Sequence, residues 1–173
     1  NSNISLNDID TDENLFYVGW NSDTSRVTIA NSMINEGSMN TSILNKYGIQ
    51  WSNPDIILNI INCTLVGDSD LNIDIDENWH INSVNTIISG YGDINVSGQL
   101  NIAYSNVESF SNYHILSDGD IIFSNIQLLD PLFIDPENGD YTLQPSSPCI
   151  NEGTDFFVWE ADTLVNMTSD EYV

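Results

Sequence analysis

The sequence DPLFIDPENGDYTLQPSSPCINEG, residues 130–153, contains two short β-like segments separated by a turn. Residues 133–134 are apolar, and residues 141–143 alternate between apolar and polar side chains as a half-buried strand does. The intervening DPENGD at 135–140 predicts a turn, because proline fixes φ and Asn-Gly accepts positive φ. Two further prolines frame a rigid loop around Cys149. The stretch therefore predicts a structure that closes a β fold.

A pattern of eight residues, rich in asparagine and β-branched side chains, repeats along the chain before this stretch. The matching segments are 27–34 (VTIANSMI), 58–65 (LNIINCTL), 81–88 (INSVNTII), 100–107 (LNIAYSNV) and, more weakly, 119–126 (GDIIFSNI). Their last residues are spaced by 31, 23, 19 and 19 positions. Periods of this order are typical of proteins that stack one structural repeat on the next.

Strands rather than helices are predicted for these repeats. No helical pattern of ten or more residues lies between them, which excludes a βαβ arrangement. We therefore predict an all-β fold of about five coils stacked about 4.8 Å apart. Asn31, Asn62 and Asn85 share one position of the repeat, followed by Tyr104 and Phe123, and predict a column of stacked side-chain amides. For this column we favour a structural role over a row of ligand-binding groups.

Three motifs near the end of the chain carry a resemblance to a known family. They are DPLF at 130–133, GDYTL at 139–143 and SPCINEG at 147–153. They resemble the closing segments of secreted bacterial right-handed parallel β-helix repeat proteins, of the choice-of-anchor and pectate-lyase-like superfamily, although Asn151 stands where that family usually has Asp. The resemblance covers roughly residues 59–153. It implies a right-handed parallel β-helix at an extracellular or cell-surface location.

Three parts are expected along the chain. Residues 1–14 are polar and turn-rich, and are expected to form an N-terminal segment or an incomplete coil. Residues 15–145 are expected to form the β-helix coils, and residues 146–173 a C-terminal cap that lies over the last coil and shields its open edge. Since a Gly-rich segment usually follows in the related proteins, we expect a truncated cap and a larger parent chain.

The charge balance narrows the range of partners. Two basic residues face 26 acidic ones, for a formal net charge of −24. Nucleic acid is excluded because its binding relies on Lys and Arg to neutralise phosphates. Anionic polysaccharides and anionic membranes are disfavoured by the same repulsion, and no apolar run is long enough for direct membrane insertion. Cations, neutral glycans and other surface proteins remain.

Residues 68–77, DSDLNIDIDE, alternate with a period of two. Asp68, Asp70, Asp74 and Asp76 fall on one side of the strand that this pattern predicts, with neighbouring carboxylates about 7 Å apart. Hard carboxylate oxygens suit Ca²⁺, so these four residues are candidate calcium ligands. The alternative is a solvated acidic face that discourages aggregation between strands.

A second, weaker calcium candidate comprises Asp8, Asp10 and Asp12. Their spacing is that of the start of an EF-hand loop, but Glu13 occupies the position that requires glycine, which excludes an EF-hand. A looser cation site and a solvated loop are the two remaining interpretations.

Tyr47 and Trp51 are the candidate ligand-binding residues. They lie in the long segment between the first two repeats, where two aromatic faces could stack on a sugar ring or pack the segment onto the coils. For Cys63 and Cys149 we favour two buried free thiols over a disulfide.

Neither a nucleophile with its base nor a pectinase-like set of acids stands out, although acidic residues for a hydrolase are plentiful. We therefore expect a non-catalytic β-helix module of a secreted or cell-surface bacterial protein, for adhesion, glycan contact or structural spacing. The alternative is a carbohydrate-active enzyme, a polysaccharide hydrolase or lyase, whose site lies partly outside this sequence.

Overall fold

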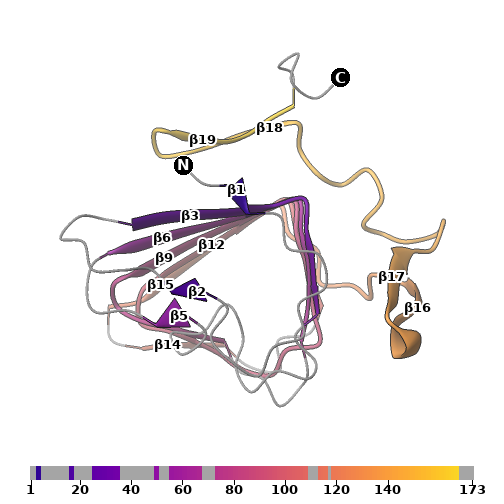
Figure 1. Cartoon of the computed structure of the whole chain (residues 1–173), viewed down its shortest axis with the longest axis horizontal. Helices are drawn as coiled ribbons and strands as arrows, with labels where there is room; N and C mark the ends of the chain where they lie inside the picture. Colours follow the sequence, from indigo (N-terminus) through magenta and orange to yellow (C-terminus); the bar gives the residue numbers. More distant parts are fainter. Residues whose placement is uncertain are drawn as a thin grey trace.

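A computed structural model describes residues 3–4, 16–17, 25–35, 49–50, 55–67, 73–108, 113–116 and 118–167. These residues form an all-β structure dominated by parallel sheets, and its one helical element among them is the short 3₁₀ helix η1 (Pro136–Asn138). The sequence is suited to this structure because its strands consist mainly of Ile, Val, Leu and Asn that alternate between two faces. Figure 1 shows the sheets arranged around one shared interior.

Three parallel sheets form the body of the molecule, which we call the parallel stack. The largest has the order β1 (Asn3–Ile4), β3 (Ser25–Ala30), β6 (Ile56–Ile61), β9 (Trp79–Val84), β12 (Gln99–Ala103) and β15 (Asp120–Ser124). The second contains β4 (Met33–Asn35), β7 (Thr64–Val66), β10 (Ile87–Ser89) and β13 (Asn106–Val107). The third contains β8 (Ile73–Ile75), β11 (Ile94–Val96) and β14 (Tyr113–Ile115). A further short parallel pair joins β2 (Phe16–Tyr17) and β5 (Ile49–Gln50).

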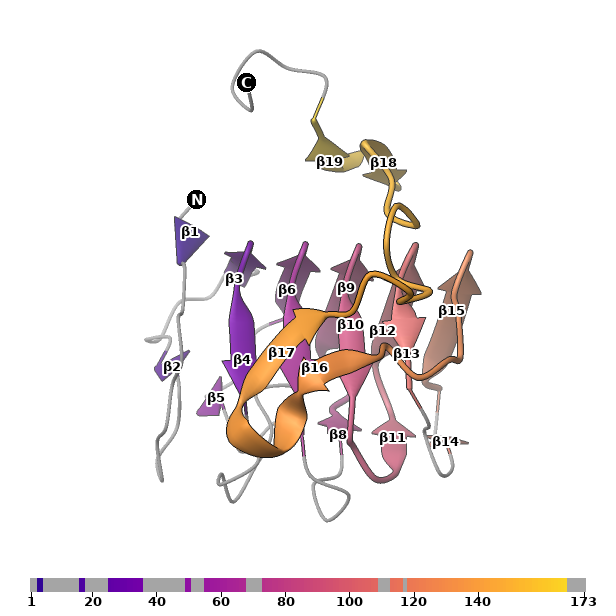
Figure 2. The same ribbon diagram turned by 90° about the vertical axis from the view of Figure 1, so that its right-hand side faces the viewer.

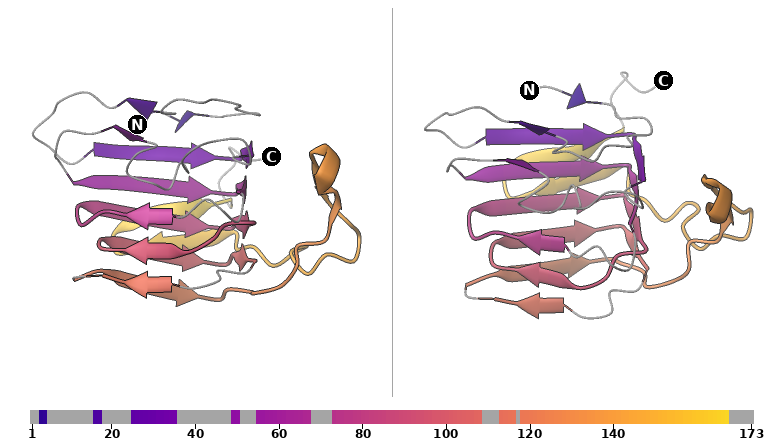
Figure 3. Two further views of the ribbon diagram at one scale, coloured as in Figure 1. Left: turned by 90° about the horizontal axis from the view of Figure 1, so that it is seen from below. Right: turned by 60° about the horizontal axis from the view of Figure 1, so that its bottom comes forward.

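Successive passes of the chain add one strand to each sheet. From β9 the chain continues through β10 and β11 before β12 pairs with β9, and the same sequence of sheets leads from β12 to β15. The strands of the largest sheet all point the same way in Figure 2, and their stacking is visible in Figure 3.

The register confirms the alignment of the first four repeats. Val27 pairs with Leu58, Leu58 with Ile81, and Ile81 with Leu100. The alignment of the fifth repeat was wrong by two residues, since Leu100 pairs with Ile121. The reason is a turn of different length: residues 97–98 connect β11 to β12, whereas residues 116–119 connect β14 to β15.

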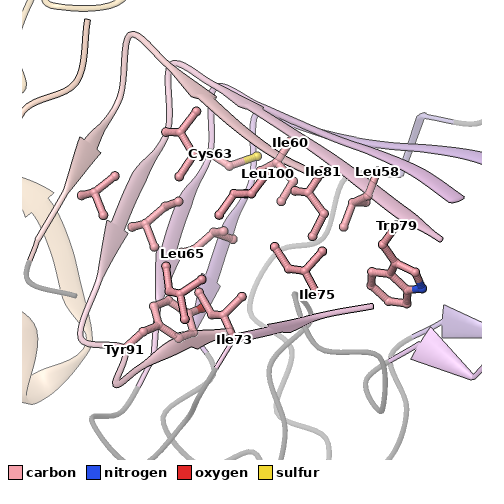
Figure 4. Packing of buried hydrophobic residues seen from close by; sticks show 14 of the residues in the cluster. Leu58, Ile60, Cys63, Leu65, Ile73, Ile75, Trp79, Ile81, Tyr91 and Leu100 are labelled. Carbon is pink, nitrogen blue, oxygen red and sulfur yellow. The ribbon is translucent and has the colours of Figure 1, made fainter. Parts of the chain in front are cut away.

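The interior of the parallel stack is a single column of apolar side chains. Leu58, Ile60, Ile81 and Ile102 from the largest sheet face residues of the other two sheets, and all are at most 1% exposed. Figure 4 shows Leu58, Ile60 and Ile81 together with the rings of Trp79 and Tyr91. Burial of this apolar surface is the main favourable term for the fold.

The C-terminal part forms two antiparallel hairpins. The first, β16 (Phe133–Asp135) and β17 (Asp140–Leu143), confirms the predicted turn: η1 lies between the strands and Gly139 has φ 81°. This hairpin stands away from the parallel stack in Figure 3. The second consists of β18 (Phe156–Trp159) and β19 (Asp162–Asn166).

The second hairpin covers the outer face of the largest sheet instead of the edge of its last strand, so the predicted position of the cap was wrong. Val165 is 3% exposed and packs with Val84 and Ala103. Arg26 also donates to Asp162 across this contact at 2.7 Å. Meanwhile β14 and β15 keep exposed apolar side chains, such as Tyr113 at 60%. Figure 1 shows β18 and β19 lying along the sheet. Complementary apolar surface on the outer face explains this position.

Candidate functional site: the corner column and the strap over it

The parallel stack has a sharp corner where each strand of the largest sheet ends. One residue there adopts positive φ in every described turn: Asn31 (52°), Asn62 (54°), Asn85 (53°), Tyr104 (48°) and Asn125 (52°). We call these five residues the corner column. Asparagine tolerates this left-handed conformation better than other residues with a side chain, which explains its recurrence.

Side-chain amides in the corner column bond to one another. The Asn62 amide donates to Oδ1 of Asn31 at 3.1 Å, and the Asn85 amide donates to Oδ1 of Asn62 at 2.9 Å. The next member is Tyr104, which interrupts the amide bonds and meets Phe157 edge to face at 5.8 Å. Phe123 does not follow it in the column, because the two-residue shift of the last repeat places Asn125 there.

A second column follows directly after the corner. Ser32, Cys63, Thr86 and Ser105 each donate to the carbonyl oxygen two residues earlier, at 2.9, 3.2, 3.1 and 2.7 Å. Cys63 therefore replaces a hydroxyl in a repeated corner bond. Burial raises the pKa of its thiol, which keeps it neutral. Both cysteines are free, with Cys63 buried and Cys149 half-buried.

Residues 147–154, which we call the strap, cross over the corner column. At one end the strap is fixed by Asn85: its amide donates to the carbonyl of Thr154, and the N–H of Thr154 donates to Oδ1 of Asn85, both at 2.8 Å. At the other end, the Ser147 hydroxyl donates to the carbonyl of Pro131 at 2.6 Å and accepts from the N–H of Cys149 at 3.1 Å. The strap is therefore tied to the corner of the parallel stack at Asn85 and to the segment before β16 at Pro131.

Gly153 allows the close approach of the strap to the corner. A Cβ atom at this position would lie 3.2 Å from Cγ and Oδ1 of Asn85. Because Asn85 is held by the amide bonds of the corner column and by Thr154, it has little freedom to move away. A residue with a side chain at 153 would therefore displace the strap.

Between the strap and the outer surface of the corner lies a cavity of about 460 Å³. Its lining consists of side chains that are mostly neutral and polar, including Tyr104, Asn125, Gln127, Cys149 and Glu152. We call it the strap cavity. Oε1 of Gln127 is buried and has no hydrogen-bond partner among the described residues. The strap cavity is within the size range of small-molecule sites.

A second amide ladder was missed by the sequence analysis. The Asn82 amide donates to Oδ1 of Asn59 at 2.9 Å, and the Asn101 amide donates to Oδ1 of Asn82 at 2.8 Å. All three are at most 6% exposed, on the same sheet that β18 and β19 cover. The signal was present, since asparagine is the second residue of three aligned repeats. The three amides bond to one another because a buried amide without a hydrogen-bond partner would destabilise the folded state.

The predicted calcium strand is described only in part. Oδ1 of Asp74 accepts from the Asn95 amide at 2.7 Å, and Oδ1 of Asp76 accepts from the N–H of Glu77 at 3.0 Å. Asp68 and Asp70 lie outside the described residues. Within the part of the chain that the structure describes, no group of three His, Cys, Asp or Glu side chains could hold a metal ion. Calcium binding by this strand stays a prediction.

The remaining predicted site residues all lie outside the described residues: they are Asp8, Asp10, Asp12, Tyr47 and Trp51.

One further hollow, of about 300 Å³, brings together two carboxyl groups. Glu108 and Asp130 line it together with Ser89 and Tyr141. The hydroxyl of Ser89 donates a short hydrogen bond to Glu108. In this hollow two acidic side chains share one depression.

Comparisons with protein-family models, curated proteins and solved structures found no match. In addition, none of the described helical segments is long and apolar enough to cross a membrane. Function is therefore argued from the geometry of the sites.

Proposed function

We propose that this chain is a right-handed parallel β-helix, akin to the closing parts of secreted bacterial β-helix repeat proteins. In this proposal it serves as a non-catalytic module of a secreted or cell-surface protein, for adhesion, glycan contact or structural spacing. Three parallel sheets in register support the β-helix, since this is how a chain that winds repeatedly through the same faces pairs its strands.

The observation that carries the structural role is the pairing of polar side chains along the stack. The ladder of Asn59, Asn82 and Asn101 and the corner column of Asn31, Asn62 and Asn85 bond successive turns to each other. Side-chain amides that bond along the axis give a stiff rod, because each turn is tied to its neighbours by both backbone and side chain. A stiff rod suits a spacer that holds other parts of a protein apart.

The proposed partners are neutral glycans or other surface proteins. A net charge of −24 repels anionic polymers, whereas uncharged sugars are insensitive to it. Most of the residues that line the strap cavity carry an amide or a hydroxyl group. Such groups form hydrogen bonds with the hydroxyl groups of sugars.

Retention on insoluble polysaccharides tests this proposal. The protein is mixed with cellulose, chitin or starch, and with calcium-crosslinked polygalacturonate as the anionic comparison. Co-sedimentation and the release of reducing ends are measured together. We expect retention on a neutral polymer with no new reducing ends. Retention on none of the neutral polymers would remove glycan contact from the proposal, and release of reducing ends would refute a non-catalytic role.

The alternative function is a polysaccharide hydrolase, and the hollow with Glu108 and Asp130 is the observation in its favour. Glycoside hydrolysis uses two carboxyl groups on either side of the scissile bond. If reducing ends are released, Glu108→Gln should abolish that release while Asp162→Asn, on the second hairpin, should leave it intact.

A calcium clamp on the strand of Asp74 and Asp76 is the remaining part of the proposal. Thermal unfolding in millimolar CaCl₂ is compared with unfolding in chelator. Calcium at about 100 times its dissociation constant raises the free energy of unfolding by about 2.7 kcal/mol. For a chain of this length the midpoint should rise by about 5–10 °C, and Asp74→Asn with Asp76→Asn should remove most of the rise. An unchanged midpoint would mean that these carboxylates bind no calcium.

A further inference from the structure

We propose that the strap cavity is a binding site for a neutral sugar, held between the corner column and residues 147–154. The inference rests on the proposed glycan contact, and it specifies a place and a chemical class for that contact. It starts from the volume of about 460 Å³ and from the two-sided attachment of the strap, which keeps the cavity preformed.

Gln127 supplies the strongest argument. Its Oε1 atom is buried without a hydrogen-bond partner among the described residues, and Gln127 is one of the residues that line the strap cavity. A buried polar atom without a partner calls for an explanation, and a bound ligand with a donor is one. A hydroxyl group satisfies Gln127 whichever amide atom faces the cavity, because a hydroxyl both donates and accepts.

Tyr104 adds an aromatic surface. It is the one aromatic residue in the corner column, where the other four members are asparagine. Asparagine is the better residue for positive φ, so tyrosine at this position is not explained by the local backbone. Tyr104 lines the strap cavity, as does Asn125, and its ring also packs edge to face against Phe157 of β18. A flat apolar ring next to polar groups is suited to a sugar, which has C–H groups on one face and hydroxyls at its edge.

The charges around the cavity select an uncharged ligand. Glu152 is the one ionisable acid on its lining, and no Lys, Arg or His from the described residues contributes to it. The Arg26 guanidinium is paired with Asp162 outside this cavity. A carboxylate, sulfate or phosphate would therefore meet a negative side chain in a chain of net charge −24. Glu152 can instead accept a hydrogen bond from a sugar hydroxyl.

Two substitutions test the site without removing the hydrogen bonds that attach the strap. Tyr104→Asn places the residue type of the other corner positions there, and Gln127→Leu replaces the unpartnered amide by an apolar side chain of similar size. Tyr113→Asn is the matched control, since Tyr113 is an exposed tyrosine in β14 that does not line the cavity. Binding of glucose, galactose, mannose and N-acetylglucosamine is measured by calorimetry and by saturation-transfer NMR, with thermal unfolding as a check on folding.

We expect at least one of the four sugars to bind, and Tyr104→Asn and Gln127→Leu each to weaken its Kd about tenfold or more. Tyr113→Asn should leave the Kd within about twofold. Tyr104→Asn also removes the edge-to-face contact with Phe157, so its unfolding temperature should fall slightly. Gln127→Leu should keep the unfolding temperature of the wild type, which separates lost binding from lost structure. Binding that both cavity variants retain would overturn the inference, and retention on a neutral polysaccharide would then still support glycan contact elsewhere. Binding of none of the four sugars would also overturn it, and failure of the retention assay as well would refute glycan contact as a whole.

Discussion

Replacement of Ser83 by valine should stabilise the protein. Ser83 lies in β9 between Ile60 and Ile102 of the neighbouring strands, at an inward-facing position of the core. It is 1% exposed, and its hydroxyl has no hydrogen-bond partner among the described residues. A polar group buried without a partner loses its bonds to water and gains none in return.

The size of the effect follows from two contributions. An unpaired buried hydroxyl costs about 1–3 kcal/mol of unfolding free energy. Valine removes that cost and buries additional apolar surface worth about 0.8 kcal/mol per carbon group. We therefore expect Ser83→Val to raise the free energy of unfolding by about 2–4 kcal/mol and the unfolding midpoint by about 4–16 °C. Ser83→Ala should raise the free energy of unfolding by about 1–2 kcal/mol.

Thermal and urea unfolding, followed by circular dichroism, measure these changes. Ser105→Ala is the matched control, because the Ser105 hydroxyl donates to the carbonyl of Ala103 and accepts from the N–H of Thr86. This variant leaves the carbonyl of Ala103 and the N–H of Thr86 without this partner, and its free energy of unfolding should fall by about 1–3 kcal/mol. If Ser83→Ala is destabilising by a similar amount, the Ser83 hydroxyl has a partner and the reasoning fails.

Three further predictions concern the ladders, the buried thiol and the strap. In urea unfolding, Asn82→Ala should lower the free energy of unfolding by about 2–4 kcal/mol because it leaves two buried amides unpaired. Asn31→Gly, at the exposed end of the corner column, should lower it by under about 1 kcal/mol because glycine accepts the left-handed backbone at this position; equal losses would contradict this ranking. The raised pKa of Cys63 means that the folded state keeps its thiol proton longer than the unfolded state, so stability should fall as pH rises from the ordinary thiol value of 9.0 towards the folded value. Cys63→Ser should flatten that alkaline decline, and an unaltered slope would show that other groups cause it. Gly153→Val should release the strap from Asn85, and limited proteolysis should then cut within residues 147–154 faster than in the wild type while the core stays folded; wild-type cleavage rates would show that the strap accommodates the side chain.

The sequence predicted the register of the parallel stack for the first four repeats. Val27, Leu58, Ile81 and Leu100 were aligned correctly because the same apolar pattern surrounds each of them. The last repeat was misaligned because Gly119 precedes an apolar run that resembles the earlier ones when shifted by two residues. A longer turn between β14 and β15 leaves no local signal of its length.

The strap cavity could not be predicted because it depends on contacts between distant parts of the chain. Asn85 and Thr154 are 69 positions apart, and nothing in either local sequence indicates that they bond. The position of the second hairpin depends in the same way on the apolar outer face around Val84 and Ala103. By contrast, the buried ladder of Asn59, Asn82 and Asn101 could have been predicted from the sequence. The alignment that predicted the corner column already placed these three asparagines at one position of the repeat.

The constant corner has a consequence for how such a chain can change its length. Paired corner residues are 31, 23, 19 and 21 positions apart, yet each described turn has one corner residue in the same left-handed conformation. The strands on either side of the corner set the cross-section, while the connections elsewhere absorb differences of up to 12 residues. The turn at 116–119 already shows two added residues accepted without loss of pairing between β12 and β15. Peptides inserted into the connections should therefore leave the corner residues and the pairing of the strands unchanged.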